Sequence, residues 1–213
     1  MTAQAIIFDL DGTLCDSRES AFWQFIELTR EYDGQAANRE TIAAAMHGTT
    51  ESVVRALVKN TQVPLEEIVR RHAELRTEST KLLQLYPGVQ ELLPLLRRMG
   101  VQVAAVTAGN QYNVRYLHDA GVHEHFRTVV TADDVTNPKP HPEGLLLALE
   151  RMGVAPEHAV MVGDTTADIH AGKRAGVIRT VAVTHGFGTL DELHAAEPDH
   201  IIHDIPSLLD VLE

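Results

Sequence analysis

At residues 5–13 the chain reads Ala-Ile-Ile-Phe-Asp-Leu-Asp-Gly-Thr, so an apolar run ends directly in two aspartates. Successive side chains of a strand alternate between its faces, and Asp9 and Asp11 are therefore expected on the same side. Gly12 allows the backbone to turn sharply behind them. Two carboxylates held together at the end of a buried strand repel each other and are costly unless they have a use. The stretch indicates metal binding or acid–base chemistry, with an acidic surface turn as the simpler alternative.

The rest of the chain alternates between strand and helix patterns. Four further apolar runs are predicted to be strands: residues 101–107, 126–131, 158–162 and 178–183. The segments between them are predicted to be helices: residues 110–120, 142–152 and 166–175. Nearly continuous apolar strands are typical of parallel sheets that helices cover on both faces. The pattern predicts an α/β fold with a doubly wound parallel sheet, whose functional loops gather at the carboxyl ends of the strands.

Residues 16–86 differ from this pattern, because they have helical periodicity and no convincing strand. They lie between the first and second predicted strands of the sheet. We therefore expect an α/β core domain formed by residues 1–15 and 87–213, with a helical domain of residues 16–86 inserted in it.

Composition excludes several classes of partner. The chain of 213 residues carries 18 Lys and Arg against 30 Asp and Glu, a net charge of −12, which disfavours binding to nucleic acids and anionic membranes. No apolar stretch approaches the roughly 20 residues of a membrane span. The single cysteine, Cys15, cannot form an internal disulfide and is expected to be a small packed apolar residue. We expect a cytoplasmic protein, either a monomer or a homodimer.

Polar residues of chemical interest also lie at or after the ends of three of the other predicted strands. The second strand ends in Thr107, and Ala108 leads into a predicted helix whose free N–H groups suit an anion. Lys139 stands between two prolines that stiffen its backbone. Asp164 follows a fourth strand, and Asp168 is predicted to lie one helical turn beyond it. Together with the two aspartates of the first strand, these acids would need a cation, and the hard oxygen ligands favour Mg²⁺ next to a phosphate.

In this order and spacing, the Asp-x-Asp-Gly-Thr motif, Thr107, Lys139 and the Gly-Asp-x-x-x-Asp motif of residues 163–168 resemble the haloacid dehalogenase-like superfamily. The resemblance covers essentially the whole chain and is closest to the phosphoglycolate phosphatase-like branch. It implies a Rossmann-like core with an inserted α-helical cap domain. It also implies that Thr107, Ala108 and Lys139 bind the phosphoryl group of a substrate.

The resemblance further implies roles for the four aspartates. Asp9 would be the nucleophile, and Asp11 the general acid and base. Mg²⁺ would be bound by Asp9, by the backbone carbonyl of Asp11 and by Asp164, and Asp168 would support the metal directly or through water.

Elementary chemistry agrees with these implied roles. An aspartate with an ordinary pKa of about 4 is ionised at neutral pH, so Asp9 is expected to attack phosphorus without a base to activate it. Asp11 must carry a proton when it meets the leaving alkoxide. Similar proteins that cleave carbon–halogen or carbon–phosphorus bonds lack an acid at the position of Asp11. Its presence favours hydrolysis of phosphomonoesters.

The predicted function is that of a Mg²⁺-dependent phosphatase that hydrolyses small phosphorylated metabolites through an aspartyl phosphate. A phosphomutase similar to β-phosphoglucomutase would share the same core residues, and a catalytically idle binding protein on the same fold is a second alternative. Specificity is expected to reside in the helical insert, where Gly48 and Arg55 are the candidates to face the substrate, with an exposed linker as the alternative.

Overall fold

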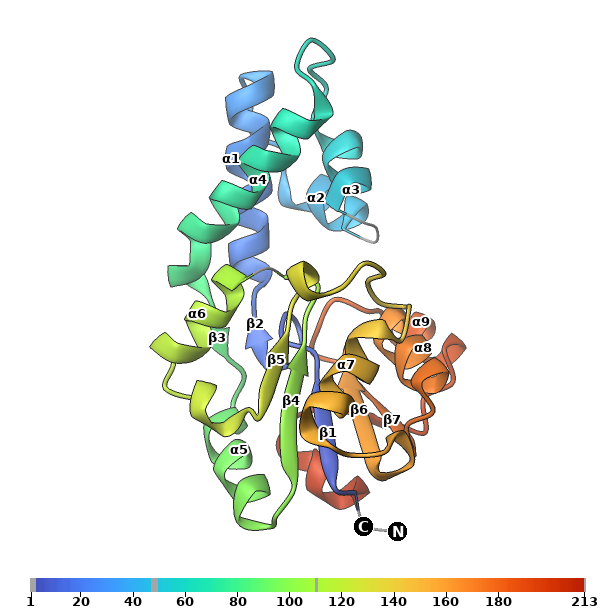
Figure 1. Ribbon diagram of the computed structural model, residues 1–213. Helices are drawn as coiled ribbons and strands as arrows, with labels where there is room; N and C mark the ends of the chain where they lie inside the picture. The colour runs from blue at the N-terminus through green and yellow to red at the C-terminus, as the bar shows by residue number, and fades with distance from the viewer. Residues whose placement is uncertain (1–2, 47–49, 110, 213) are drawn as a thin grey trace. The chain divides into compact units, whose positions relative to one another are not determined.

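The computed structural model describes residues 3–46, 50–109 and 111–212 (Figure 1). The chain divides into two compact units. The first comprises Met1–Asp16 and Gln84–Glu213, and the second comprises Ser17–Leu83. Within the described residues, no helix combines the length and the apolar character that a membrane span requires.

The first unit is built on a six-stranded parallel sheet with the strand order β5-β4-β1-β6-β7-β8. Its strands are β1 (Ala5–Phe8), β4 (Gln102–Val106), β5 (Thr128–Val130), β6 (Ala159–Gly163), β7 (Arg179–Val183) and β8 (His200–Ile202). The chain first builds outward from β1 through β4 to β5, and then returns to the other side of β1 with β6. This reversal places a topological switch point beside β1, where such sheets bind their ligands. The predicted α/β class with a doubly wound parallel sheet is confirmed.

Helices cover both faces of the sheet, as Figure 1 shows for α5 and α7. The helices of this unit are α5 (Val89–Arg98), α6 (Gln111–Asp119), α7 (Glu143–Met152), α8 (Thr166–Ala175) and α9 (Leu190–Ala195). Strand β1 is fully buried: Ile6 and Phe8 pack in the cluster that contains the leucines of α5, and Ala5 and Ile7 pack in the one that contains those of α7. Burial on both faces explains why β1 is a continuous apolar run.

Short elements complete this unit. Strands β2 (Cys15–Asp16) and β3 (Gln84–Leu85) pair as an antiparallel ribbon where the chain leaves and re-enters the unit. The 3-10 helices of this unit are η2 (His123–His125), η3 (Ala132–Asp134), η4 (Pro156–His158) and η5 (Pro206–Val211). Cys15 is buried in the core cluster, as expected of a packed apolar residue.

The second unit is helical. It contains α1 (Arg18–Asp33), α2 (Arg39–Ala45), α3 (Thr50–Leu57), α4 (Leu65–Glu78) and η1 (Ser79–Leu82). These helices surround their own apolar core, to which Leu28, Ile42, Val54 and Leu75 contribute. A histidine lies in this core: His72 of α4 is only 6% exposed, and its ring stacks on Phe25 with the centroids 4.6 Å apart.

We expect the stability of the helical unit to fall as the pH drops from about 6.5 towards 4, because His72 is buried as a neutral ring. Burial, reinforced by the positive charge of Arg76, lowers the pKa of His72 to about 4. Its Nε2 has no hydrogen-bond partner among the described residues. Between the two pKa values the unfolded chain binds the additional proton, so up to about 3 kcal/mol of stability is lost on acidification.

Urea unfolding followed by the fluorescence of Trp23, the single tryptophan of the chain, measures this effect within the helical unit. His72→Phe keeps an aromatic ring against Phe25 and removes the titrating group. The variant should therefore lose less stability than the wild type between pH 7.5 and pH 5. Equal losses in the two proteins would show that other groups cause the acid sensitivity.

Candidate active site

Two aspartates are placed by neighbouring strands of the sheet. Asp9 directly follows β1, and its backbone N–H donates to the carbonyl of Val162 in β6 at 2.9 Å. Asp164 directly follows β6. Because parallel strands end at the same edge of a sheet, the two carboxylates emerge side by side, next to the switch point at β1.

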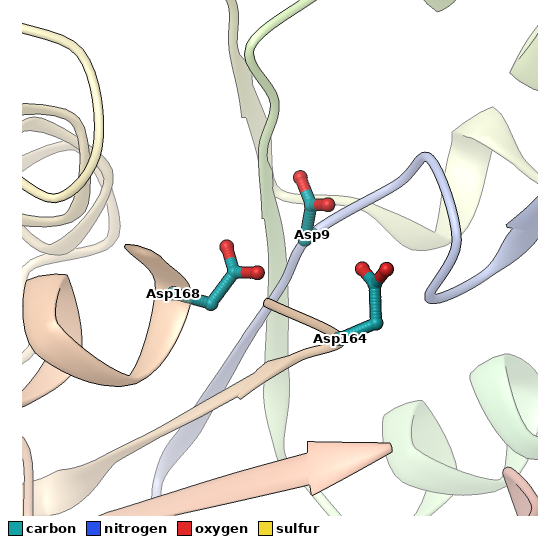
Figure 2. A group of neighbouring side chains, drawn as sticks. All are labelled: Asp9, Asp164 and Asp168. Atoms are coloured by element: carbon teal, nitrogen blue, oxygen red, sulfur yellow. The ribbon is translucent and has the colours of Figure 1, made fainter. Parts of the chain in front are cut away.

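A third carboxylate, that of Asp168, joins them from the first turn of α8, as Figure 2 shows. Asp9, Asp164 and Asp168 each offer a carboxylate oxygen, and these oxygens all lie within 4.8 Å of one another. All three residues are buried, with exposed fractions of 7%, 0% and 0%. The structure therefore brings together three of the four aspartates predicted from the sequence.

Lys139 lies among these acids. Its Nζ donates to Asp9 Oδ1 and to Asp168 Oδ1, each at 2.6 Å, and to the carbonyl of Val106 at 2.9 Å. All three protons of the ammonium group are thus engaged. Burial opposes its charge, but Asp168 and Asp9 outweigh that cost and raise the pKa of Lys139 above its ordinary value. Lys139 is therefore a permanently charged partner of two of the acids.

Asp164 is held by groups from two distant segments. Thr13 Oγ1 donates to Asp164 Oδ1 at 2.8 Å, and the backbone N–H of Phe187 donates to Asp164 Oδ2 at 2.7 Å. Gly12 passes so close that a Cβ there would lie 2.3 Å from Asp164 Oδ2. Only glycine fits at this position, which also has a φ of +86°.

Asp168 is positioned by a capping box at the start of α8. The backbone N–H and the Oγ1 of Thr165 donate to Asp168 Oδ2 at 3.0 and 2.6 Å. The prediction that Asp168 lies one helical turn beyond Asp164 is wrong, because Asp164 precedes the helix and belongs to the strand end. The two carboxylates meet because the turn between β6 and α8 folds Asp168 back over Gly163, where a Cβ would lie 2.3 Å from that of Asp168.

The remaining predicted residues of this unit lie at the same edge of the sheet. Asp11 is half-buried in the turn after β1, and its side chain is not part of the group of three carboxylates. Thr107 follows β4, is buried, and accepts a hydrogen bond from the backbone N–H of Gly109 at 2.9 Å. Thr107, exposed Ala108 and Lys139 all line one small cavity of about 10 Å³. That volume suits no more than a single water, so a phosphoryl group would lie outside it.

Of the two residues predicted to face a substrate from the helical insert, Gly48 lies outside the described residues. Arg55 is exposed near the end of α3. Its role stays a prediction.

Sequence reasoning missed the hydroxyl of Thr13 and the segment 184–188, both of which contact Asp164. Thr13 belongs to the first motif, but no role for its hydroxyl was predicted. The sequence does offer a signal for this segment, because Gly186 and Gly188 lie shortly after a predicted strand. Glycines at such a place indicate that the backbone closely approaches another part of the protein.

Burial and neighbouring negative charges raise the pKa values of two of these acids. Burial raises the pKa of Asp9 well above its usual range, with Lys139 opposing the rise and Asp168 and Asp164 adding to it. Burial, reinforced by Asp168, raises the pKa of Asp164 to about 7. The pKa of Asp9 is therefore above the ordinary value expected from the sequence.

The donor set fits a divalent ion. Three buried carboxylates face a single ammonium group, so two negative charges are uncompensated when all four groups are ionised. A cation would favour the ionised carboxylates in place of protons. Carboxylate oxygens are hard ligands of the kind that Mg²⁺ prefers. Asp9, Asp164 and Asp168 are the residues that would hold it.

Comparison with known proteins agrees with this geometry. The family model described as haloacid dehalogenase-like hydrolase matches residues 6–183. The pyrophosphatase PpaX of Halalkalibacterium halodurans is 32% identical over 217 residues, which cover 100% of this chain and 98% of that protein. The probable phosphatase IndB of Dickeya dadantii is 35% identical over 206 residues, covering 92% and 88% of the two chains.

A solved structure shares the fold. The crystal structure of a predicted phosphoglycolate phosphatase from Haemophilus somnus 129pt matches this chain with a TM-score of 0.89 and 22% sequence identity. The match covers 100% of this chain and 99% of that chain. That identity supports the fold alone, while the family match and the closer relatives carry the assignment. The chain therefore belongs to the haloacid dehalogenase-like hydrolase family.

Proposed function

We propose that the protein is a Mg²⁺-dependent phosphatase that hydrolyses small phosphorylated metabolites through an aspartyl phosphate on Asp9. The observation that carries the proposal is the placement of the Asp9 carboxylate, which lies at the end of the central strand, 2.6 Å from the Lys139 ammonium and beside two further acids. A buried nucleophile that is paired with a cation among metal-type ligands suits attack on an anionic phosphoryl group. We further propose that the enzyme works in the cytoplasm, as a monomer or a homodimer.

The reaction has two steps. A carboxylate oxygen of Asp9 attacks phosphorus, the bond from phosphorus to the ester oxygen breaks, and Asp11 gives its proton to the leaving alkoxide. Asp11, now ionised, takes a proton from water, whose oxygen attacks phosphorus and breaks the bond to Asp9. Inorganic phosphate leaves, and both side chains return to their initial state.

Charge neutralisation by the surrounding groups lowers both barriers. When bound, Mg²⁺ supplies positive charge that neutralises the phosphoryl oxygens. Lys139 adds a fixed ammonium group, and the backbone N–H groups at the start of α6, with Thr107, are proposed to hold the remaining phosphoryl oxygens. Exclusion of water would strengthen each of these interactions.

The relatives guide the choice of substrates for a test. The name of the PpaX proteins supports inorganic pyrophosphate as one candidate, beside small phosphomonoesters such as phosphoglycolate. A phosphomutase would use the same core residues, so a sugar 1-phosphate belongs in the same panel. The phosphatase proposal requires that phosphate is released into solution rather than transferred to another hydroxyl group.

The test measures inorganic phosphate released from pyrophosphate, phosphoglycolate, p-nitrophenyl phosphate and β-glucose 1-phosphate, with Mg²⁺ and with EDTA. We expect release that depends on Mg²⁺ from at least one of these compounds. Conversion of β-glucose 1-phosphate to the 6-phosphate without phosphate release would instead identify a mutase. Purified protein that does neither with any of them would be an idle binding protein, and the proposal would be wrong.

A further inference from the structure

We propose that the turn formed by residues 184–188, directly after β7, positions the active site, and that His185 is its positioning residue. The turn contacts the loop that carries Asp9, and it also contacts the backbone and the side chain of Asp164. None of the residues of the turn has a proposed chemical role. The inference rests on the proposed function and extends it to residues outside the family motifs discussed above.

Two backbone N–H groups of the turn donate hydrogen bonds to Asp164. The N–H of Phe187 donates to Asp164 Oδ2 at 2.7 Å, and the N–H of Gly188 donates to the carbonyl oxygen of Asp164 at 3.2 Å. A Cβ on Gly186 would lie 2.2 Å from Asp164 Oδ2, and a Cβ on Gly188 would lie 2.3 Å from the Asp164 carbonyl oxygen. Glycine is therefore required at both positions for the backbone to come this close.

The side chain of His185 reaches the catalytic loop. Its Nε2 lies 3.0 Å from the carbonyl oxygen of Thr13. A carbonyl can only accept, so the proton of the imidazole must sit on Nε2 for this bond to form. The ring itself is held by Tyr86, whose ring centroid lies 4.0 Å away and whose hydroxyl donates to the carbonyl of His185 at 3.0 Å.

These contacts link the turn, Thr13 and Asp164 to one another. Thr13, which accepts from His185 through its carbonyl, donates through Oγ1 to Asp164 Oδ1 at 2.8 Å. The other oxygen of Asp164 is bound by the backbone of Phe187, which lies in the same turn as His185. The loop after β1 and the loop after β6 are thus linked through one turn. Such outer hydrogen bonds fix the orientation of metal-ligating carboxylates, and their loss typically costs about 10- to 100-fold in metal affinity or activity.

The experiment compares His185→Gln with His185→Met. The two side chains have similar length, but only Gln retains an N–H near the place of Nε2. In the Met variant we expect kcat for phosphate release to fall about 10- to 100-fold with little change in KM, and the Mg²⁺ dissociation constant, measured by calorimetry without substrate, to rise by a similar factor. The Gln variant should recover both quantities to within about threefold of wild type.

A double-mutant cycle tests the path through Thr13. If His185 acts through that residue, His185→Met should weaken Mg²⁺ binding less than about twofold in a Thr13→Val background, because the link to Asp164 is already cut. Full additivity would contradict the proposed path.

The outcomes separate a positioning role from a packing role. Equal losses in the Met and Gln variants, together with a lowered thermal midpoint in both, would assign His185 to packing alone and overturn the inference. Wild-type behaviour of both variants would overturn it as well. A wild-type protein that releases no phosphate but binds Mg²⁺, with weaker binding in the Met variant, would refute the proposed function and leave the inference standing.

Discussion

Replacing Asp9 by Asn is expected to abolish phosphate release while the protein stays folded. The amide has nearly the same shape as the carboxylate, and its oxygen can still accept from Lys139, but it cannot attack phosphorus. Loss of a nucleophile that works as a unit with its neighbours costs on the order of 10⁶-fold in kcat. Stopped assays on the best substrate of the panel, with and without Mg²⁺, give the turnover of both proteins.

The matched control for this variant is Asp119→Asn. Asp119 lies on α6 with its side chain 67% exposed and only a loose ion pair to Arg115 at 3.9 Å, so its loss should leave turnover unchanged. Phosphate transferred to the wild-type protein should be recovered as an acid-stable, hydroxylamine-sensitive label that the Asp9→Asn variant lacks. Residual turnover of that variant above about 1% of wild type would refute the nucleophile assignment.

The strands nearest the site were predictable because they are buried on both faces. Strand β1 has no exposed residue, so its sequence is a plain apolar run with a sharp polar end. Strand β8 was missed, because it has three residues at the edge of the sheet and only Ile202 is buried. The ribbon of β2 and β3 was missed for a similar reason, since two residues per strand leave no periodicity to detect.

The site residues that directly follow a strand could be predicted from the sequence. The contacts between residues far apart in the sequence could not. Asp9 and Asp164 carry a local signal, an acid after an apolar run. The bond from Thr13 to Asp164 joins residues 151 positions apart, and the Thr13–His185 contact joins residues 172 apart. No periodicity within a segment encodes such a pairing, which depends on the order of strands in the sheet. The position of Lys139 between Asp9 and Asp168 is likewise set by the fold.

Replacing Lys139 by Met is expected to damage both catalysis and stability. The side chain keeps about the same length, but Asp9 and Asp168 lose a cation that lies 2.6 Å from each of them. Removing one partner of a buried ion pair costs about 3–5 kcal/mol of unfolding free energy, because the remaining charges stay buried. Removing one preorganised charge from a reacting centre costs about 10²- to 10³-fold in kcat.

The pH dependence of Lys139→Met distinguishes lost charge from lost packing. Lys139 lowers the pKa of Asp9, so without it the native state holds protons on its carboxylates to a still higher pH than the wild-type native state does. A native state that binds more protons becomes less stable as the pH rises, so urea unfolding without Mg²⁺ should show the variant losing stability from pH 5 to pH 8 more steeply than wild type. The control is Lys173→Met, whose native side chain is 41% exposed with its ammonium 4.0 Å from exposed Glu197, and which should change stability by less than about 1 kcal/mol. A uniform loss at every pH would mean that Lys139 contributes packing rather than charge, and the electrostatic account of the site would then be wrong.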